Sequence, residues 1–272
     1  MPTTLTSEAL LAKFASDPRT RTLVTCASGA QKSRVHLRGL TGSSRAFAGA
    51  AAFRLEPRPA LFVLRDKECA AYFYNDLEQI LDDTGRKPEV KQVLFFPASF
   101  KRDYNSGIRD NPGLLSRTEV LNRIFSGGAA FLTVTYPEAL AEKVVNRPFF
   151  EKHTLRLSSG EKVSLDFVLD LLVEYEFERT DFVVEPGQFS LRGGLIDVYS
   201  FSGEYPYRIE FVGDHVESIR SFDPSTQLSV EKKDEISIVP NIRIDPAKRI
   251  DYASVLTFLP GETVIWTDDL RL

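Results

Sequence analysis

The sequence has few of the residues that build metal sites, disulfides or membrane spans. Only two of its 272 residues are cysteine and three are histidine. Cys26 and Cys69 lie far apart without a C-x-x-C partner, which argues against a zinc site or a disulfide framework, so we expect both to be reduced packing residues. His36, His153 and His215 are scattered, and none has the spacing of metal ligands.

Long apolar runs are also missing. No stretch approaches the roughly 20 uninterrupted apolar residues needed to span a bilayer, and the N-terminus has no basic segment followed by an apolar core. We therefore expect a cytoplasmic location and no membrane partner. The remaining composition, 43% hydrophobic and 26% charged, excludes intrinsic disorder, and the length corresponds to about two folded units.

The charge is unevenly distributed along the chain. Residues 1–58 hold 9 Lys/Arg and 3 Asp/Glu, whereas residues 59–272 hold 25 and 35, for a net charge of −4 overall. A negative chain is unsuited to strong non-specific phosphate binding. The basic part leaves two alternatives open, a weak nucleic-acid contact or a solvated basic face, centred on Lys32, Arg34, Arg38, Arg45, Arg54 and Arg58.

The first half alternates short apolar runs with helical patterns, the order typical of a parallel sheet covered by helices. The expected strands are Val35–Arg38, Ala60–Leu64, Gln92–Phe96 and Ala130–Thr135. The expected helices are Ala46–Phe53, Asp66–Leu81, Arg117–Phe125 and Pro137–Val144. The polar, turn-rich segment Phe100–Leu115 is expected to be a surface loop. The pattern predicts an α/β first domain at residues 1–145.

Near residue 146 the pattern changes. Ser164 is expected to cap a helix that runs to about Phe177, with an acidic stripe of Asp166, Asp170 and Glu174. Short strands with Gly and Pro turns are expected around it, at Thr154–Leu157, Phe182–Val184, Phe189–Leu191, Ile196–Phe201, Tyr207–Val212 and Val216–Phe222. This order predicts a smaller α+β domain at residues 146–240, inserted after the first domain and built on an antiparallel sheet. Residues 241–272 either start a third, truncated segment or return to the first domain.

The run Gly39-Leu40-Thr41-Gly42-Ser43-Ser44-Arg45-Ala46 lies between an expected strand and an expected helix, where backbone N–H groups can cradle phosphate. A working phosphate loop needs a lysine for the β/γ-phosphates and then a Ser/Thr hydroxyl for magnesium. Arg45 and Ala46 hold those two places, and Ala46 cannot ligate a metal. We therefore expect a degenerate loop formed by Gly39, Gly42, Ser43, Ser44, Arg45 and Ala46, with no catalytic residue, metal or cofactor in this chain.

Three segments of the second domain strongly resemble one module: Phe177–Asp181, Pro186–Tyr199 and Tyr207–Phe211. That module is the second domain shared by the excision-repair protein UvrB and the bacterial transcription-repair coupling factor (Mfd) family. The first domain resembles the same two families more loosely, through its damaged phosphate loop and its order of elements. The similarity continues through Asp223 and covers the whole second domain.

Two differences from UvrB proteins favour the coupling-factor family. UvrB proteins have an intact phosphate loop and a long aromatic hairpin in the first domain. Here the loop is degenerate, and the hairpin candidate is the short segment Phe100–Leu115, with Tyr104 as its single tyrosine. The chain therefore resembles the N-terminal UvrB-like module of coupling factors.

The resemblance implies a degenerate RecA-like, P-loop-type first domain and a third segment like domain 1b of UvrB. It also implies that this chain is a non-enzymatic adaptor, which recruits UvrA to stalled transcription complexes in nucleotide excision repair. In this family the full-length protein is an ATP-dependent DNA translocase, so ATP, magnesium, RNA polymerase and double-stranded DNA are implied for its other parts. The alternative is a nucleotide- or DNA-binding UvrB-like repair module.

The resemblance also carries over a UvrA-binding set of Arg179, Arg192 and Tyr199, while Ser190 stands where UvrB has another arginine. Arginines and an aromatic ring are the usual composition of interface hot spots, because arginine donates charge-assisted hydrogen bonds to carboxylates. A structural alternative stays open, in which Arg192 serves a turn, Arg179 pairs with a neighbouring carboxylate and Tyr199 packs in the sheet.

Overall fold

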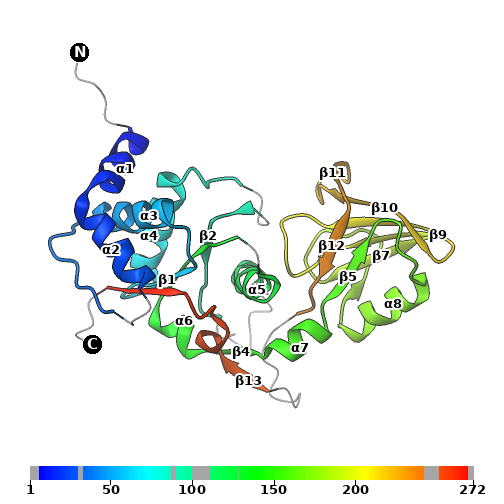
Figure 1. Ribbon diagram of the computed structural model, residues 1–272. Coiled ribbons are helices and arrows are strands. Elements are labelled where there is room, and N and C mark those ends of the chain that lie inside the picture. Colours follow the sequence, from blue (N-terminus) through cyan, green and yellow to red (C-terminus); the bar gives the residue numbers. More distant parts are fainter. Residues whose placement is uncertain are drawn as a thin grey trace. The chain divides into compact units, whose positions relative to one another are not determined.

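The computed structural model describes residues 6–29, 33–86, 90–99, 111–127, 129–241 and 251–268. The chain forms two compact units (Figure 1). Unit 1 comprises residues 1–98, 127–141 and 259–272, and unit 2 comprises residues 99–126 and 142–258. This division differs from the three predicted ranges, because segments before residue 145 and after residue 240 are divided between the two units.

Unit 1 is built on a four-stranded parallel sheet in the order β14-β1-β3-β2. Its strands are β1 (Ala60–Val63), β2 (Val93–Phe95), β3 (Leu132–Thr135) and β14 (Val264–Thr267). Three predicted strands are thereby confirmed, and the tail returns to the first unit through β14. The fourth predicted strand, Val35–Arg38, is wrong. Val35 and Leu37 are both exposed, so these two apolar side chains do not lie on the buried face of a sheet.

The helices of unit 1 are α1 (Ser7–Ser16), α2 (Pro18–Ser28), α3 (Ser44–Leu55), α4 (Lys67–Ile80) and α6 (Pro137–Ala141). Helices α3, α4 and α6 were expected from the sequence, whereas α1 and α2 were missed. Helix α6 is shorter than the expected Pro137–Val144, because Lys143–Val145 forms a strand. Both missed helices have clear start signals. Thr6 accepts a hydrogen bond from the N–H of Ala9, and Asp17 accepts one from Arg19 with Pro18 in the first turn.

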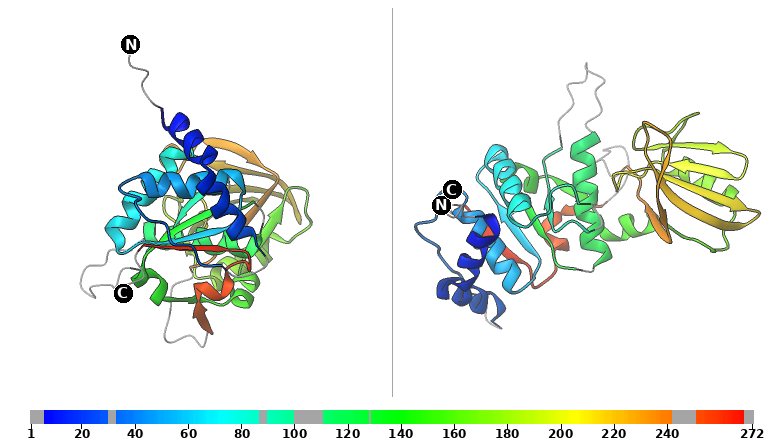
Figure 2. Two further views of the ribbon diagram at one scale, coloured as in Figure 1. Left: turned by 60° about the vertical axis from the view of Figure 1, so that its left-hand side comes forward. Right: turned by 90° about the horizontal axis from the view of Figure 1, so that it is seen from above.

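Helix α3 is buried along most of its length, between α1 and α2 and the sheet. Figures 1 and 2 show α1, α2 and α3 side by side. The rings of Phe14 in α1 and Phe47 in α3 stack at 5.5 Å. On the sheet side, a Cβ at Gly49 would lie 2.8 Å from the ring of Phe62 in β1. The run of alanine and glycine in this helix therefore allows close packing on two sides.

Unit 2 centres on a six-stranded sheet in the order β11-β10-β9-β8-β7-β6, in which all neighbours are antiparallel except β6 and β7. The strands are β6 (Glu178–Arg179), β7 (Gln188–Arg192), β8 (Leu195–Val198), β9 (Tyr207–Val212), β10 (His215–Phe222) and β11 (Ser229–Lys233). The predicted antiparallel sheet is confirmed. The predicted strand Phe182–Val184 is wrong, because this segment connects β6 to β7 without joining the sheet.

Unit 2 also contains helices, a 3₁₀ turn and two short antiparallel strand pairs outside this sheet. The helices are α5 (Asn111–Ser126), α7 (Arg147–Lys152), α8 (Leu165–Glu174) and the 3₁₀ turn η2 (Val255–Phe258). Two antiparallel pairs join β5 (Leu155–Ser158) to β12 (Glu235–Ile238) and β4 (Lys143–Val145) to β13 (Tyr252–Ser254). Helix α8 begins after Ser164 as predicted, and its buried face carries Val168 and Leu172. The Ser164 side chain makes no capping hydrogen bond, however, and the helix ends at Glu174 rather than near Phe177.

Some sequence predictions concern residues that the structure does not describe. Tyr104 and most of the hairpin candidate lie outside the described residues. The prediction of a surface loop is wrong at Asn111–Leu115, which begins helix α5 with Leu114 buried. Cys26 and Cys69 are free and partly buried. None of the described helices is long and apolar enough to cross a membrane.

The buried carboxylate of Asp83 joins the end of α4 to the start of β2. It accepts hydrogen bonds from the backbone N–H groups of Gln92 and Val93 at 2.8–3.0 Å, and Arg86 lies 3.6 Å away. We expect Asp83→Asn to lower the free energy of unfolding by about 2 kcal/mol, because an amide cannot accept these N–H groups with a full charge.

The control is Asp82→Asn at the exposed neighbour, whose positive φ asparagine tolerates. It should change the free energy by less than about 0.5 kcal/mol. Urea unfolding followed by circular dichroism compares the two variants, and equal effects would contradict this role for Asp83.

Candidate functional site

The predicted phosphate loop lies at the carboxyl-terminal edge of the parallel sheet. Nη1 of Arg45 donates a hydrogen bond of 2.7 Å to Oδ2 of Asp268, which directly follows β14. The N–H of Asp268 donates to the carbonyl of Val63 at the end of β1. Ligands of open parallel sheets bind at this edge, so the position suits a phosphate. The charge of Arg45, however, is already paired with a carboxylate of the chain itself.

The loop is also closed by its own hydrogen bonds. The Ser44 hydroxyl donates to the carbonyl of Thr41 at 2.6 Å and accepts the Thr41 N–H at 2.8 Å. Gly39 and Gly42 adopt positive φ angles of 81° and 54°, which favour glycine. Ser43 precedes α3 without a side-chain cap, and Ala46 is fully buried. The side chains at the lysine and magnesium positions are therefore an ion-paired arginine and a buried methyl group.

Other basic residues of the first 58 are also paired. Arg58 contacts Glu56 at 2.5 Å, and Arg54 lies 3.9 Å from Glu8. Arg34 and Arg38 are exposed on the described segment before the loop, and Lys32 lies outside the described residues. The predicted basic face is therefore partly neutralised by nearby carboxylates, which weakens it as a phosphate-binding surface.

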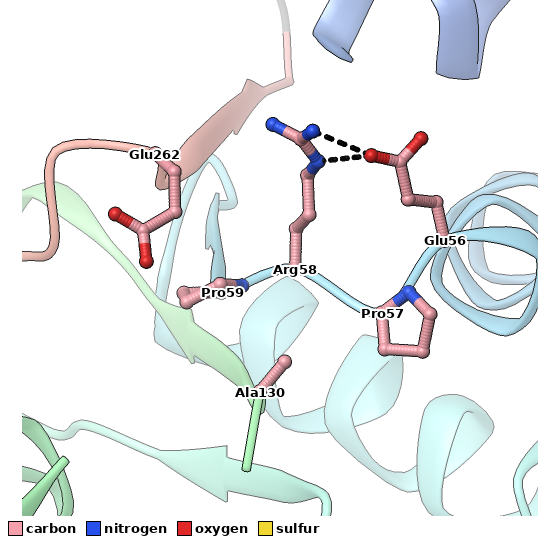
Figure 3. Close-up of a pocket in the computed structure, with 6 residues that line it drawn as sticks. All are labelled: Glu56, Pro57, Arg58, Pro59, Ala130 and Glu262. Atoms are coloured by element: carbon pink, nitrogen blue, oxygen red, sulfur yellow. Dashed lines mark hydrogen bonds and ion pairs between the residues drawn. The ribbon is translucent and has the colours of Figure 1, made fainter. Parts of the chain in front are cut away.

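An open hollow of about 420 Å³ lies on unit 1 (Figure 3), lined by Glu56, Pro57, Arg58, Pro59, Ala130 and Glu262. Hydrogen bonds from the Ser28 hydroxyl and then from Arg58 lower the pKa of Glu56. The hollow lies where β1, β3 and β14 begin, whereas ligands of parallel sheets bind where the strands end. Its place in the fold therefore gives no reason to assign it a ligand.

One face of the six-stranded sheet in unit 2 is charged. Register aligns Ser190, Asp197, Arg208, Arg220 and Lys232 across five strands. Residues two positions along a strand share a face, which adds Arg192 and Glu210. We call Arg192, Asp197, Arg208, Glu210, Arg220 and Lys232 the charged face. The opposite face is apolar, with Phe189, Ile196, Ile209 and Ile219 all buried.

Asp197 is the centre of the charged face. Its side chain is fully buried and accepts hydrogen bonds from Arg208 at 2.7 and 2.8 Å and from Nη2 of Arg192. These bonds with Asp197 raise the pKa of Arg208. The Arg208 guanidinium also lies 4.5 Å from the ring centre of Phe222. Sequence reasoning missed Asp197 and Arg208, although a carboxylate and an arginine in alternating positions of neighbouring strands were a readable signal.

The structure does not bring the three predicted UvrA-binding residues together. Arg179 is exposed on β6 and pairs in register with Phe189, which places it on the opposite face from Arg192. Tyr199 shares the face of Arg192 but is only 8% exposed. It packs with Val183 and Phe222, and its hydroxyl donates to the carbonyl of Glu204 at 2.6 Å.

Arg192 itself is accessible, with 43% of its side chain exposed beside Asp197. Ser190, two residues earlier on the same face, is buried and offers a partner no accessible side chain. Of the predicted set, Arg179 and Arg192 are therefore available to a partner, and Tyr199 supports the fold.

Comparisons with known proteins show what the two units are similar to. Residues 155–243 match the family model of the UvrB interaction domain. The chain is 29% identical to the transcription-repair-coupling factor of Bacillus subtilis over 204 residues and 30% identical to that of Myxococcus xanthus over 207 residues. The matches cover 75% and 76% of this chain but 17% of each relative.

The UvrABC system protein B of Nitratidesulfovibrio vulgaris is also similar, 27% identical over 207 residues, which is 70% of this chain and 29% of that protein. The matched family covers most of unit 2, including the charged face. The resemblance to the N-terminal UvrB-like module of coupling factors is confirmed.

The buried ion pairs of Asp197 should contribute more to stability than an exposed pair on the same face. Asp197→Ala leaves Arg192 and Arg208 without their carboxylate, and we expect it to lower the free energy of unfolding by about 3–5 kcal/mol. The matched control is Glu210→Ala, which removes the partner of Arg220 from a pair whose side chains are 44% and 39% exposed. That loss should stay below about 1 kcal/mol. Urea unfolding measures both, and similar losses would contradict this assignment.

Proposed function

We propose that this chain, similar as it is to the N-terminal UvrB-like module of transcription-repair coupling factors, is a non-catalytic adaptor that recruits UvrA to stalled transcription complexes in nucleotide excision repair. The match of residues 155–243 to the UvrB interaction domain carries this proposal. The exposed guanidinium of Arg192 supports it, because an accessible arginine at the surface of a folded domain suits charge-assisted binding of a carboxylate.

Unit 1 is, in this proposal, a RecA-like ATPase domain that has lost its chemistry. Two observations support it: the loop lies at the carboxyl-terminal edge of a parallel sheet, and Asp268 takes the charge of Arg45. Nucleotide and magnesium then belong to other parts of the full-length protein, as do contacts with RNA polymerase and double-stranded DNA. The chain spans about 17% of the coupling factors it matches.

UvrA binding is tested by calorimetric titration of purified UvrA with the native chain and with Arg179→Ala and Arg192→Ala separately. Single variants are needed because the two arginines lie on different faces. Each lost charge-assisted contact should cost about 1.5–3 kcal/mol, which is roughly a 10- to 150-fold rise in Kd. Arg192→Ala leaves Asp197 paired with Arg208, so unit 2 should stay folded.

Arg220→Ala is the control, because Arg220 lies on the same face with a similar exposed fraction and a carboxylate partner. Its effect on Kd should stay within about threefold. A native chain that does not bind UvrA at micromolar concentration would contradict the adaptor function.

The absence of ATP chemistry is tested with ATP and magnesium. We expect no phosphate release from the native chain, and none from Asp268→Asn, since freeing Arg45 restores no magnesium ligand at Ala46. Magnesium-dependent turnover that Arg45→Ala abolishes would favour the nucleotide-binding alternative.

A further inference from the structure

The segment Thr180–Glu185 crosses one end of the charged face between β6 and β7. Val183 is fully buried against Tyr199 and Phe222. Its neighbours Phe182 and Val184 are 61% and 52% exposed. The segment therefore uses one side chain to cover the sheet and presents an aromatic ring and an isopropyl group to solvent.

Hydrogen bonds to backbone groups hold the segment in this conformation. The Thr180 hydroxyl donates to the carbonyl of Phe182 at 3.0 Å, and Oε1 of Gln188 accepts the N–H of Val184 at 2.9 Å. Nε2 of Gln227 donates to the carbonyl of Val183 at 3.3 Å. A backbone fixed in this way loses little conformational freedom when a partner binds, which favours affinity.

Phe182 also touches Arg192. The guanidinium carbon of Arg192 lies 5.8 Å from the centre of the Phe182 ring, within the range of a cation–π contact. Asp197 holds Nη2 of the same guanidinium, and Asp197 is in turn fixed by two hydrogen bonds from Arg208. Among the described residues, Asp197 is the one hydrogen-bond acceptor of the Arg192 side chain. Arginine has five N–H donors, so further donors remain for a ligand.

We propose that Phe182 and Arg192 form one anchor for a protein partner that presents a carboxylate beside an apolar side chain. The proposal rests on the proposed function and identifies the part of unit 2 that its partner contacts. The fork of Arg192 binds the carboxylate, and the ring of Phe182 covers the adjoining apolar group and keeps water from the ion pair. A partly enclosed arginine beside an aromatic ring is the usual chemistry of an interface hot spot.

The charge of the domain favours a protein over a nucleic acid. Residues 155–243 hold 9 Lys/Arg and 17 Asp/Glu, a net charge of −8, which repels a phosphate backbone. The charged face is locally positive, with four basic residues and two carboxylates. Such a surface can attract a single carboxylate of a protein while the domain as a whole rejects a polyanion.

The test is the Kd for UvrA, measured by calorimetry for Phe182→Ala, Arg192→Lys and the double variant. We expect each single change to raise Kd about 10-fold, since alanine removes the apolar cover and lysine cannot reproduce the planar fork. The double variant should lose less than the product of the single losses, because the two side chains act together.

Two matched controls separate this anchor from general surface effects. Phe167→Ala removes another exposed phenylalanine of the same unit, 52% exposed on α8, and Arg220→Lys alters the similarly exposed arginine of the charged face. Both should leave Kd within twofold. Because Phe182 is largely exposed, its variant should keep the native circular dichroism and unfolding midpoint.

If Phe182→Ala binds UvrA within twofold of the native chain, or if the two losses multiply, the anchor is overturned while the adaptor function stands. If the native chain does not bind UvrA, both are overturned. Retention of the native chain on a single-stranded oligonucleotide, lost in Phe182→Ala, would show that the ring stacks on a base and would also overturn the proposal.

Discussion

The pairing of one buried carboxylate with two arginines organises the charged face of unit 2. Asp197 stands in the middle of the six-stranded sheet with no exposed surface, where an unpaired charge would be strongly unfavourable. Arg208 satisfies it with two hydrogen bonds, and Arg192 adds a third from the neighbouring strand. Because Arg208 suffices to neutralise Asp197, Arg192 can stay half-exposed. Its guanidinium is still oriented by the hydrogen bond to Asp197. In the proposed function, stability and recognition thus depend on the same carboxylate.

In unit 1, too, a carboxylate of the chain neutralises an arginine. An arginine at the carboxyl-terminal edge of a parallel sheet is placed where a phosphate would bind. Here Asp268 supplies the negative charge from within the chain, and the turn before α3 closes on its own hydroxyl, that of Ser44. In the proposed function, this ion pair occupies the place where a phosphate would bind to the loop.

Much of the fold was predictable because its elements carry local signals. The apolar runs of β1, β2 and β3 are buried by helices, and their sequence shows it. Val35–Arg38 alternates apolar and polar residues but is not buried, since an alternating pattern alone does not show that a segment joins a sheet. Helices α1 and α2 were missed because their apolar residues do not form a clear stripe along one face of the helix. These two helices are held in the fold by packing against α3.

The sequence by itself determined the residue types available for binding: two arginines and a tyrosine in a segment that resembles a known module, and a phosphate loop without its lysine or hydroxyl. Only the tertiary structure decided which of them a partner can reach. Strand register puts Arg179 and Arg192 on opposite faces, and Val183 covers Tyr199. The pairings Arg45–Asp268 and Arg192–Phe182 were likewise invisible in the sequence, because hydrogen bonds and ring contacts between distant or alternating positions depend on how strands align in space.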